Sequence, residues 1–131
     1  MCGIAGVISP LAERPVGMAL RLMLDGQVHR GPDDGGVSVF KSEEATVGLG
    51  NRRLAILDTS PLGHQPMVNP DTGDTLVYNG EIYNCPELRQ SLEAAGYSFR
   101  GRSDTEVLLR AYEHWGIQCL ERLRGMFAFA L

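Results

Sequence analysis

The chain has 131 residues, a length typical of one domain with its own hydrophobic core. Its net charge of -4 provides no basic surface, which argues against a nucleic-acid partner. No apolar run is long enough to span a membrane, and the N-terminus lacks the basic and apolar regions of a signal peptide. We therefore expect a cytoplasmic protein without a membrane partner.

The cysteines and histidines predict no metal site. The three cysteines are odd in number and lack Cys-x-x-Cys spacing, so they favour neither a disulfide framework nor a thiolate metal site. The three histidines also lack ligand spacing. We expect neither a metal nor another cofactor in this chain.

The first half of the chain predicts short strands and one helix. In chain order we expect a buried strand at residues 3–9, a helix at 15–28, a loop at 29–36, short strands at 37–40, 45–49 and 53–57, and a long surface loop at 60–73. Pro15 suits the start of the helix.

The second half predicts strands at residues 75–78 and 81–83, with Asn79-Gly80 as a hairpin turn between them. A helix is expected at 86–95, and a second helix begins after Ser103, whose spacing to Glu106 is that of a capping box. Short strands and helices in this order predict layered α and β structure.

The last residues, 125–131, form an apolar run of strand character without a following turn or polar tail. Because terminal residues usually fray in solvent, we expect this chain to be the N-terminal piece of a longer protein. A terminal strand without a partner would expose an aggregation-prone edge.

Cys2 is the first candidate for chemistry, because removal of Met1 would make it the N-terminal residue. A terminal cysteine carries its own base, the free α-amine, and nucleophiles activated in this way are a recognised catalytic arrangement. By itself the pair is weak evidence, since a buried, inert cysteine in the first strand explains it more simply.

Four further features have both a structural and a chemical interpretation. Arg53 is either a surface cation or a planar group that binds a carboxylate. Asn79 and Gly80 form a turn, or supply an amide and an N–H to an oxyanion. Asp104 is a favourable acid in a first helical turn or a partner for an ammonium group. His29 is a structural hydrogen bonder or a general base to the thiol. Singly the structural interpretations are favoured, but jointly the features form a set.

Seven motifs occur in order: MCGIAG (1–6), HRGPD (29–33), RLAILD (53–58), GHQPM (63–67), NGEIYN (79–84), SDTEV (103–107) and GMFAFAL (125–131). The series resembles the N-terminal glutaminase domain of glutamine-hydrolysing asparagine synthetases, which are class II glutamine amidotransferases. The resemblance spans essentially the whole chain. It implies an α+β fold, a four-layer αββα sandwich of N-terminal-nucleophile hydrolase type, incomplete at its C-terminus. Residues 1–131 would be part of that domain.

The resemblance also implies catalytic roles. Cys2, freed of Met1, would attack the side-chain amide of glutamine, and its own α-amine would shuttle the proton. Asn79 and the Gly80 N–H would stabilise the oxyanion. Next to this group, His29 and Arg30 are expected to shape the loop that supports the N-terminal strand.

A second group would bind the substrate. The resemblance implies that Arg53 holds the α-carboxylate of glutamine, while Asp104 and Glu81 hold its α-ammonium. Backbone groups near Ile56 and Leu57 would complete the pocket. A site that pairs both charged ends rejects analogues that lack either one.

The family's ATP-dependent synthetase domain is absent from these residues, which contain no Ser-Gly-Gly-rich pyrophosphate loop. ATP and Mg are therefore expected only in that absent domain. The implied partners are L-glutamine and the synthetase domain, which would receive the ammonia, and a homodimer of the full-length protein stays open.

Three alternatives remain open. The first is a non-catalytic fragment or interaction module. The second is an amidotransferase whose acceptor is not aspartate, and the third is a hydrolase of some other amide. Arg53 and Asp104 together argue against the last, because they match an amino-acid zwitterion. Relatives that close β-lactam rings have generally lost the cysteine, so Cys2 favours glutaminase chemistry.

Overall fold

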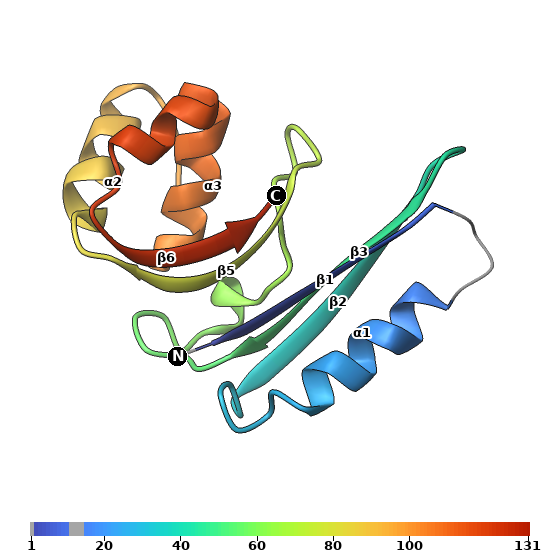
Figure 1. The fold of residues 1–131 in the computed structure, drawn as a ribbon. Helices are drawn as coiled ribbons and strands as arrows, with labels where there is room; N and C mark the ends of the chain where they lie inside the picture. Colours follow the sequence, from blue (N-terminus) through green and yellow to red (C-terminus); the bar gives the residue numbers. More distant parts are fainter. Residues whose placement is uncertain (1, 11–14) are drawn as a thin grey trace.

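The computed structural model describes residues 2–10 and 15–131, which are arranged as a helix, two sheets and a further pair of helices in four successive layers (Figure 1). The elements are β1 (Gly3–Ser9), α1 (Val16–Asp25), β2 (Asp34–Lys41), β3 (Thr46–Arg53), β4 (Met67–Val68), β5 (Thr75–Ile82), α2 (Cys85–Ala94), α3 (Asp104–Trp115) and β6 (Gly125–Ala130), with 3₁₀ turns at Pro61–Gly63 and Gly116–Glu121. The α+β, αββα architecture expected from the sequence is thus observed.

The first sheet has the strand order β1-β3-β2, and both pairings are antiparallel. Gly3 of β1 lies opposite Arg52 of β3, and Asp34 of β2 lies opposite Arg53. The start of β1 and the end of β3 therefore lie side by side at one end of the sheet. This register brings Cys2 next to the end of β3.

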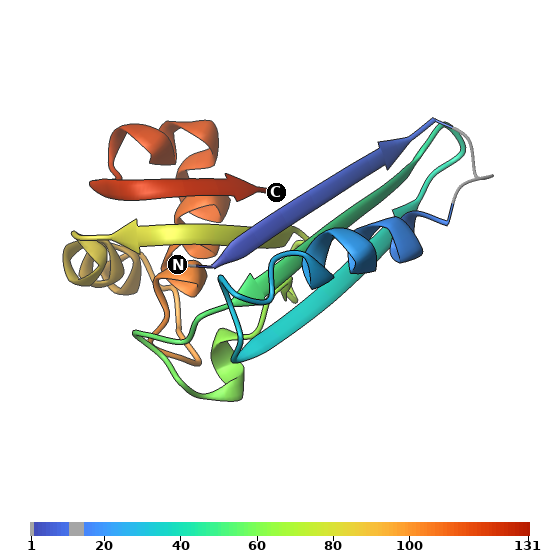
Figure 2. The same ribbon diagram turned by 60° about the horizontal axis from the view of Figure 1, so that its bottom comes forward.

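Helix α1 covers the outer face of this sheet, which Figure 2 shows from a second direction. Its buried side chains, Val16, Leu20 and Leu24, form a small core with Ala5 of β1. Glycines of β3 make this close approach possible, because a Cβ at Gly48 would overlap the side chains of Leu20 and Val16.

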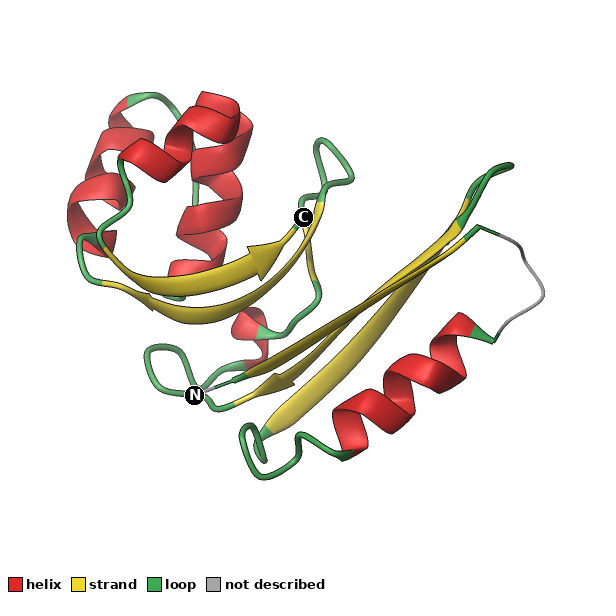
Figure 3. Ribbon diagram, viewed as in Figure 1, coloured by secondary structure: helices red, strands yellow, loops and turns green. Residues whose placement is uncertain are grey.

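The second sheet, β4-β5-β6, carries α2 and α3 on its outer face (Figure 3). Alternate residues of β5, Leu76, Tyr78 and Ile82, point into the core between sheet and helices, where Leu92 and Leu108 are fully buried. The intervening β5 residues then face the first sheet, because side chains alternate along a strand.

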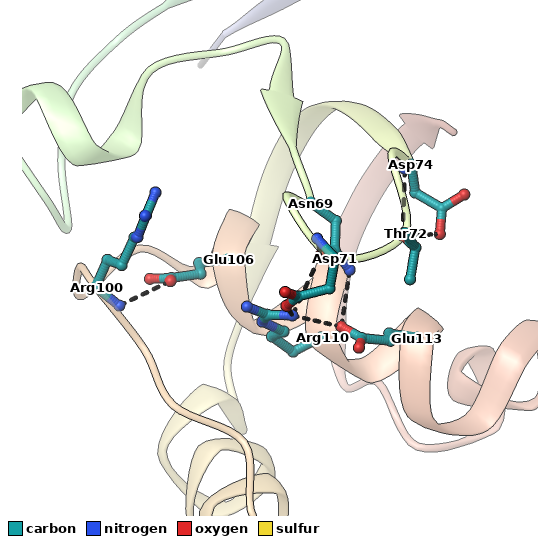
Figure 4. Close-up of polar contacts among 8 residues, drawn as sticks. All are labelled: Asn69, Asp71, Thr72, Asp74, Arg100, Glu106, Arg110 and Glu113. Atoms are coloured by element: carbon teal, nitrogen blue, oxygen red, sulfur yellow. Dashed lines mark hydrogen bonds and ion pairs between the residues drawn. The ribbon is translucent and has the colours of Figure 1, made fainter.

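The segment between β4 and β5 is fastened to α3 by a buried amide (Figure 4). Asn69, which is 1% exposed, donates to Glu113 at 2.7 Å and accepts from Arg110 at 3.2 Å and from the Asp71 N–H at 3.0 Å. Burial alone would lower the pKa of Arg110, but its bonds to Glu113 and Asp71 raise it above the ordinary value. These contacts fix the point at which the chain enters β5.

The predicted Asn79-Gly80 hairpin is wrong, because both residues lie inside β5. They pair with Ala128 and Phe127 of β6. Gly80 is needed for space and not for a turn: a Cβ there would overlap the backbone of Met126 and Phe127. The turn signal thus reflects a close approach between two strands.

The predicted strand at 53–57 is also wrong, since β3 ends at Arg53 and residues 54–59 have no regular structure. The strands on either side, β1 and β2, begin opposite Arg52 and Arg53, so neither strand extends far enough to pair with residues 54–59. The loop expected at 29–36 is shorter than predicted, because β2 begins at Asp34, and α1 ends at Asp25 instead of residue 28.

The N-cap of α3 is confirmed, and its capping box is only half formed. The Ser103 side chain accepts from the Glu106 N–H at 3.3 Å. The Glu106 carboxylate instead accepts from the backbone N–H groups of Arg100 and Gly101, both at 2.8 Å. It therefore anchors the loop before the helix and not the cap itself.

We expect Gly48→Ala to lower the free energy of unfolding by about 1–3 kcal/mol, because the new methyl group overpacks the α1 interface. Gly6→Ala is the matched control, since a Cβ at Gly6 would meet its nearest neighbour, Leu49, at an ordinary 3.7 Å. Urea unfolding of both variants measures the difference. Equal stability of the two variants would contradict this account of the packing.

Candidate active site

A small cavity of about 60 Å³ lies where Cys2 and the end of β3 meet β5 and the start of α3. Seven of the eight residues predicted for the site line it: Cys2, Arg53, Ile56, Leu57, Gly80, Glu81 and Asp104. The eighth, Asn79, precedes Gly80 in β5 and is not among the lining residues. Residues from distant parts of the sequence thus converge on one cavity.

Cys2 is half-buried and held from both sides. Its Sγ accepts from the Leu54 N–H at 3.4 Å and lies 3.7 Å from the Leu54 carbonyl oxygen, to which it donates. Arg30 donates from Nε to the Cys2 carbonyl oxygen at 3.1 Å. The thiol is therefore fixed at the cavity wall by Leu54, the residue that follows β3, and the Cys2 backbone is held by the loop before β2. The predicted removal of Met1 concerns a residue outside those that the structure describes.

Arg53 is 7% exposed, and backbone carbonyls hold its guanidinium group. Nη1 donates to the Ser60 carbonyl at 3.1 Å, and Nη2 donates to the Asp58 carbonyl. Gly63 packs against the same group, since a Cβ there would overlap Nη2. Neutral carbonyls orient the guanidinium group, whose planar fork suits the binding of an anionic group.

Asp104 contributes a carboxylate to the wall of the cavity. Its Oδ2 accepts from the Tyr78 hydroxyl at 2.7 Å and from the Ile82 N–H at 3.3 Å. Burial, followed by the neighbouring Asp104, raises the pKa of the Tyr78 phenol well above its ordinary value, so Tyr78 stays a donor. Both contacts use Oδ2 and hold the side chain in one orientation.

The edge of β5 that faces the cavity presents a row of backbone N–H groups. Residues two apart in a strand direct their N–H groups to the same side. On this side the Tyr78 N–H donates to Gln65 Oε1 at 2.6 Å and the Ile82 N–H donates to Asp104. Gly80 lies between them and lines the cavity. Its N–H is therefore directed to the side on which a ligand would bind.

Asn79 carries an orphaned polar atom. Its Oδ1 is buried without a hydrogen-bond partner, as is Oδ1 of Asn51, while Asn51 Nδ2 donates to the Tyr78 carbonyl at 3.3 Å. A buried acceptor without a partner is costly, and such atoms often mark functional sites.

The remaining predicted residues lie at the cavity mouth or wall. Glu81 is half-buried and lines the cavity. Ile56 and Leu57 are 59% and 51% exposed and belong to the irregular segment after β3. Their segment bounds the opening without forming part of a core.

Sequence reasoning missed Gln65 and Asp58, which also line the cavity. Asp58 accepts from the backbone N–H groups of Ser60 and Arg102, and hydrogen bonding to Ser60 and Arg102 keeps the pKa of its carboxyl below the ordinary value. The Asp-x-Ser spacing is a signal for such a local turn. Gln65 precedes a proline in a segment that sequence alone predicts to be a surface loop.

The other two sequence candidates differ in outcome. Arg30 supports the N-terminal strand as expected, through its bond to the Cys2 carbonyl. His29 is exposed and is not among the residues that line the cavity. The arrangement therefore does not favour His29 as a base for the thiol.

Within residues 2–10 and 15–131, no group of three or more His, Cys, Asp or Glu side chains could hold a metal ion. In the same residues, no helix is long and apolar enough to cross a membrane.

The fold is shared with a solved amidotransferase structure. It matches the glutamine phosphoribosylpyrophosphate amidotransferase of B. subtilis with a TM-score of 0.74 and 23% identity, over 95% of this chain and 34% of that one. This likeness confirms the N-terminal-nucleophile hydrolase fold expected from the sequence. The family model described as glutamine amidotransferase domain matches residues 1–131, so the chain belongs to that family.

The chain is also similar in sequence to several curated proteins. The chain is 46% identical to asparagine synthetase [glutamine-hydrolyzing] 1 of Bacillus subtilis, over 100% of this chain and 20% of that protein. It is 37% identical to putative asparagine synthetase [glutamine-hydrolyzing] 2 of Methanocaldococcus jannaschii (100% and 27%) and 38% identical to amidase chry2 of Gibberella zeae (100% and 21%). The chain thus spans about a fifth to a quarter of the length of these relatives.

We expect the alkylation rates of the buried thiols to depend strongly on pH. Burial, and then the nearby Asp104, raise the pKa of Cys85 to about 11, and burial also raises the pKa of Cys119. At about pH 8 only ~0.1% of Cys85 is thiolate, so iodoacetamide should modify it slowly in the folded protein. Its rate should rise steeply towards about pH 11. Peptide mapping measures the rates.

The urea-denatured chain is the control for this experiment, because both thiols should then react at the pH of an ordinary cysteine. Rapid labelling of Cys85 in the folded protein at about pH 8 would contradict the expectation.

Proposed function

We propose that this chain hydrolyses the side-chain amide of glutamine through a γ-glutamyl thioester on Cys2. The observation that carries the proposal is that Cys2, Arg53, Gly80 and Asp104 line one cavity. Family membership and the relatives' name, glutamine-hydrolysing asparagine synthetase, support the same substrate.

In the proposed reaction Cys2 is the N-terminal residue, and its Sγ attacks the Cδ carbonyl carbon. The thiol proton moves to the α-amine and then to the leaving nitrogen, directly or through a water. The Gly80 N–H and the Asn79 amide donate to the oxyanion, and losing one such donor typically costs about 10²–10³ in rate. The tetrahedral adduct collapses, the C–N bond breaks and ammonia leaves. Water then attacks the thioester, which releases glutamate and returns a proton to the thiol.

The charged groups match the two ends of an amino acid. Arg53 would bind the α-carboxylate through a bidentate contact. Asp104, whose Oδ2 is occupied by protein donors, would offer Oδ1 to the α-ammonium, with Glu81 as a second acceptor. The segment of Ile56 and Leu57 would cover the substrate.

We further propose that residues 1–131 act as the glutaminase domain of a longer protein, in which an ATP-dependent asparagine synthetase domain receives the ammonia. The relatives' lengths and names support this arrangement. ATP and Mg would be bound by that other domain. An acceptor other than aspartate is the second candidate, supported by the 38% identity to a protein named an amidase. A cytoplasmic location and a homodimer stay predictions.

A diazo-ketone analogue of glutamine should add once to the wild-type protein, at Cys2, and not to Cys2→Ala. Intact-protein mass with peptide mapping measures the adduct and shows whether Met1 is removed. Cys85→Ala is the matched control and should label as wild type does. An adduct on Cys85, or a processed and folded chain that takes none, would contradict the proposed nucleophile and would favour a non-catalytic module.

Replacing Arg53 tests the assignment of the substrate. We expect Arg53→Ala to raise the half-saturating concentration of the analogue at least about 10-fold, because the α-carboxylate loses a bidentate partner. The exposed Arg100→Ala is the control and should label as wild type does. Unchanged saturation in Arg53→Ala would point to an amide substrate that is not an amino acid.

A further inference from the structure

Strand β4 stops short of the cavity. Its last pairing towards the site joins Met67 to Leu76 of β5. Continued in the same register, Gln65 would lie opposite Tyr78, with Pro66 between. The backbone ladder between β4 and β5 ends at the Met67–Leu76 pair. The edge of β5 beyond Leu76 therefore needs other partners.

The side chain of Gln65 replaces the missing strand. Its Oε1 accepts from the Tyr78 N–H at 2.6 Å, and its Nε2 donates to Thr105 Oγ1 at 3.2 Å. The residue is 3% exposed, so neither contact is shared freely with solvent. One buried amide thus links β5 to the first turn of α3, which also carries Asp104.

The bond to Tyr78 fixes the part of β5 that faces the cavity. The Tyr83 N–H donates to the Arg124 carbonyl at 2.7 Å, on the β6 side of the strand. The N–H groups of Tyr78 and Ile82 point the other way, and strand alternation directs the Gly80 N–H with them. Gly80 therefore lies between two N–H groups that buried side chains hold in place.

The same peptide segment is held a second time, from the first sheet. Asn51 of β3 is fully buried, and its Nδ2 donates to the Tyr78 carbonyl at 3.3 Å. Tyr78 thus has its N–H bound by one side-chain amide and its carbonyl by another. Asn79 and Gly80 follow directly along the chain.

We propose that Gln65 is a positioning residue of the site: it holds the β5 edge so that the Gly80 N–H points at the developing oxyanion, and it ties this edge to the helix start that carries Asp104. The inference rests on the proposed glutamine chemistry. A purely apolar packing role does not fit, because a hydrocarbon side chain would leave the buried Tyr78 N–H without a partner.

Gln65→Met removes both hydrogen bonds at similar size, whereas Gln65→Glu keeps an acceptor for the Tyr78 N–H. In Gln65→Met we expect amide exchange of Tyr78, followed by NMR, to accelerate at least about 10-fold. The maximal rate of Cys2 labelling by the diazo-ketone should fall about 10-fold, with the half-saturating concentration changed less than about 3-fold, since an oxyanion donor acts in the transition state. Gln65→Glu should recover most of both losses.

The exposed Gln90 provides matched controls, because Gln90→Met and Gln90→Glu make the same chemical changes on α2. Wild-type exchange at Tyr78 in Gln65→Met, or labelling that falls no further than in Gln90→Met, would overturn the proposal. So would equal losses in Gln65→Met and Gln65→Glu, or faster exchange spread over the whole chain, which marks general destabilisation.

The two readouts separate this inference from the proposed function. Suppose that wild type takes no adduct while Tyr78 exchange accelerates only in Gln65→Met. The proposed glutamine chemistry then fails, and the positioning proposal fails with it, although the hydrogen bond that holds β5 is confirmed. If wild type labels at Cys2 and Gln65→Met labels equally fast, the chemistry stands and the role of Gln65 is refuted.

Discussion

The site depends first on the antiparallel register between β1 and β3. Because Gly3 lies opposite Arg52, the residue before the strand, Cys2, comes next to the end of β3, where Arg53 and Leu54 follow. Residues near a chain end often fray, yet ladder hydrogen bonds of β1 and the two Leu54 contacts hold Cys2 at a defined place. A shift of the register by one residue would turn every β1 side chain to the other face of the sheet.

The second sheet contributes a strand edge with backbone donors at the cavity. Such edges are usually covered, because exposed N–H and carbonyl groups recruit other chains. Here the ladder with β4 ends at the Met67–Leu76 pair, and side chains of Gln65 and Asp104 take individual N–H groups. The uncovered edge is thereby reduced to the short stretch at Gly80, inside a cavity. Asn51 joins this edge to β3, so the two sheets are coupled at the site itself.

The sequence predicts the elements whose signal is local and misses features that depend on a distant partner. The strand at β1, the helix α2 and the Ser103 cap follow from periodicity, proline placement and side-chain spacing. The Asn79-Gly80 pair misled because the same two residues suit a turn or a close strand neighbour, and only the approach of β6 decides between them.

The candidate site shows the same division. Residues with a distinctive functional group, such as Cys2, Arg53 and Asp104, could be selected from the sequence and its family resemblance, and they do converge. Gln65 could not, because its importance comes from the residue it faces across a broken ladder. Asn79 has a suitable amide, but it is not among the residues that line the cavity.

The distribution of charge explains why such a cavity would select its nitrogen donor while leaving its acceptor undetermined. Arg53, Asp104 and Glu81 line one cavity, so under the proposed function a ligand with only one charged end would leave one of these charges without its counterpart. In the proposed function, that requirement favours an amino acid as the ligand. Relatives named as an asparagine synthetase and as an amidase both match the chain over its whole length. In this proposal the task of the 131 residues is to recognise one amide donor, and the fate of the released nitrogen is decided by residues outside the cavity.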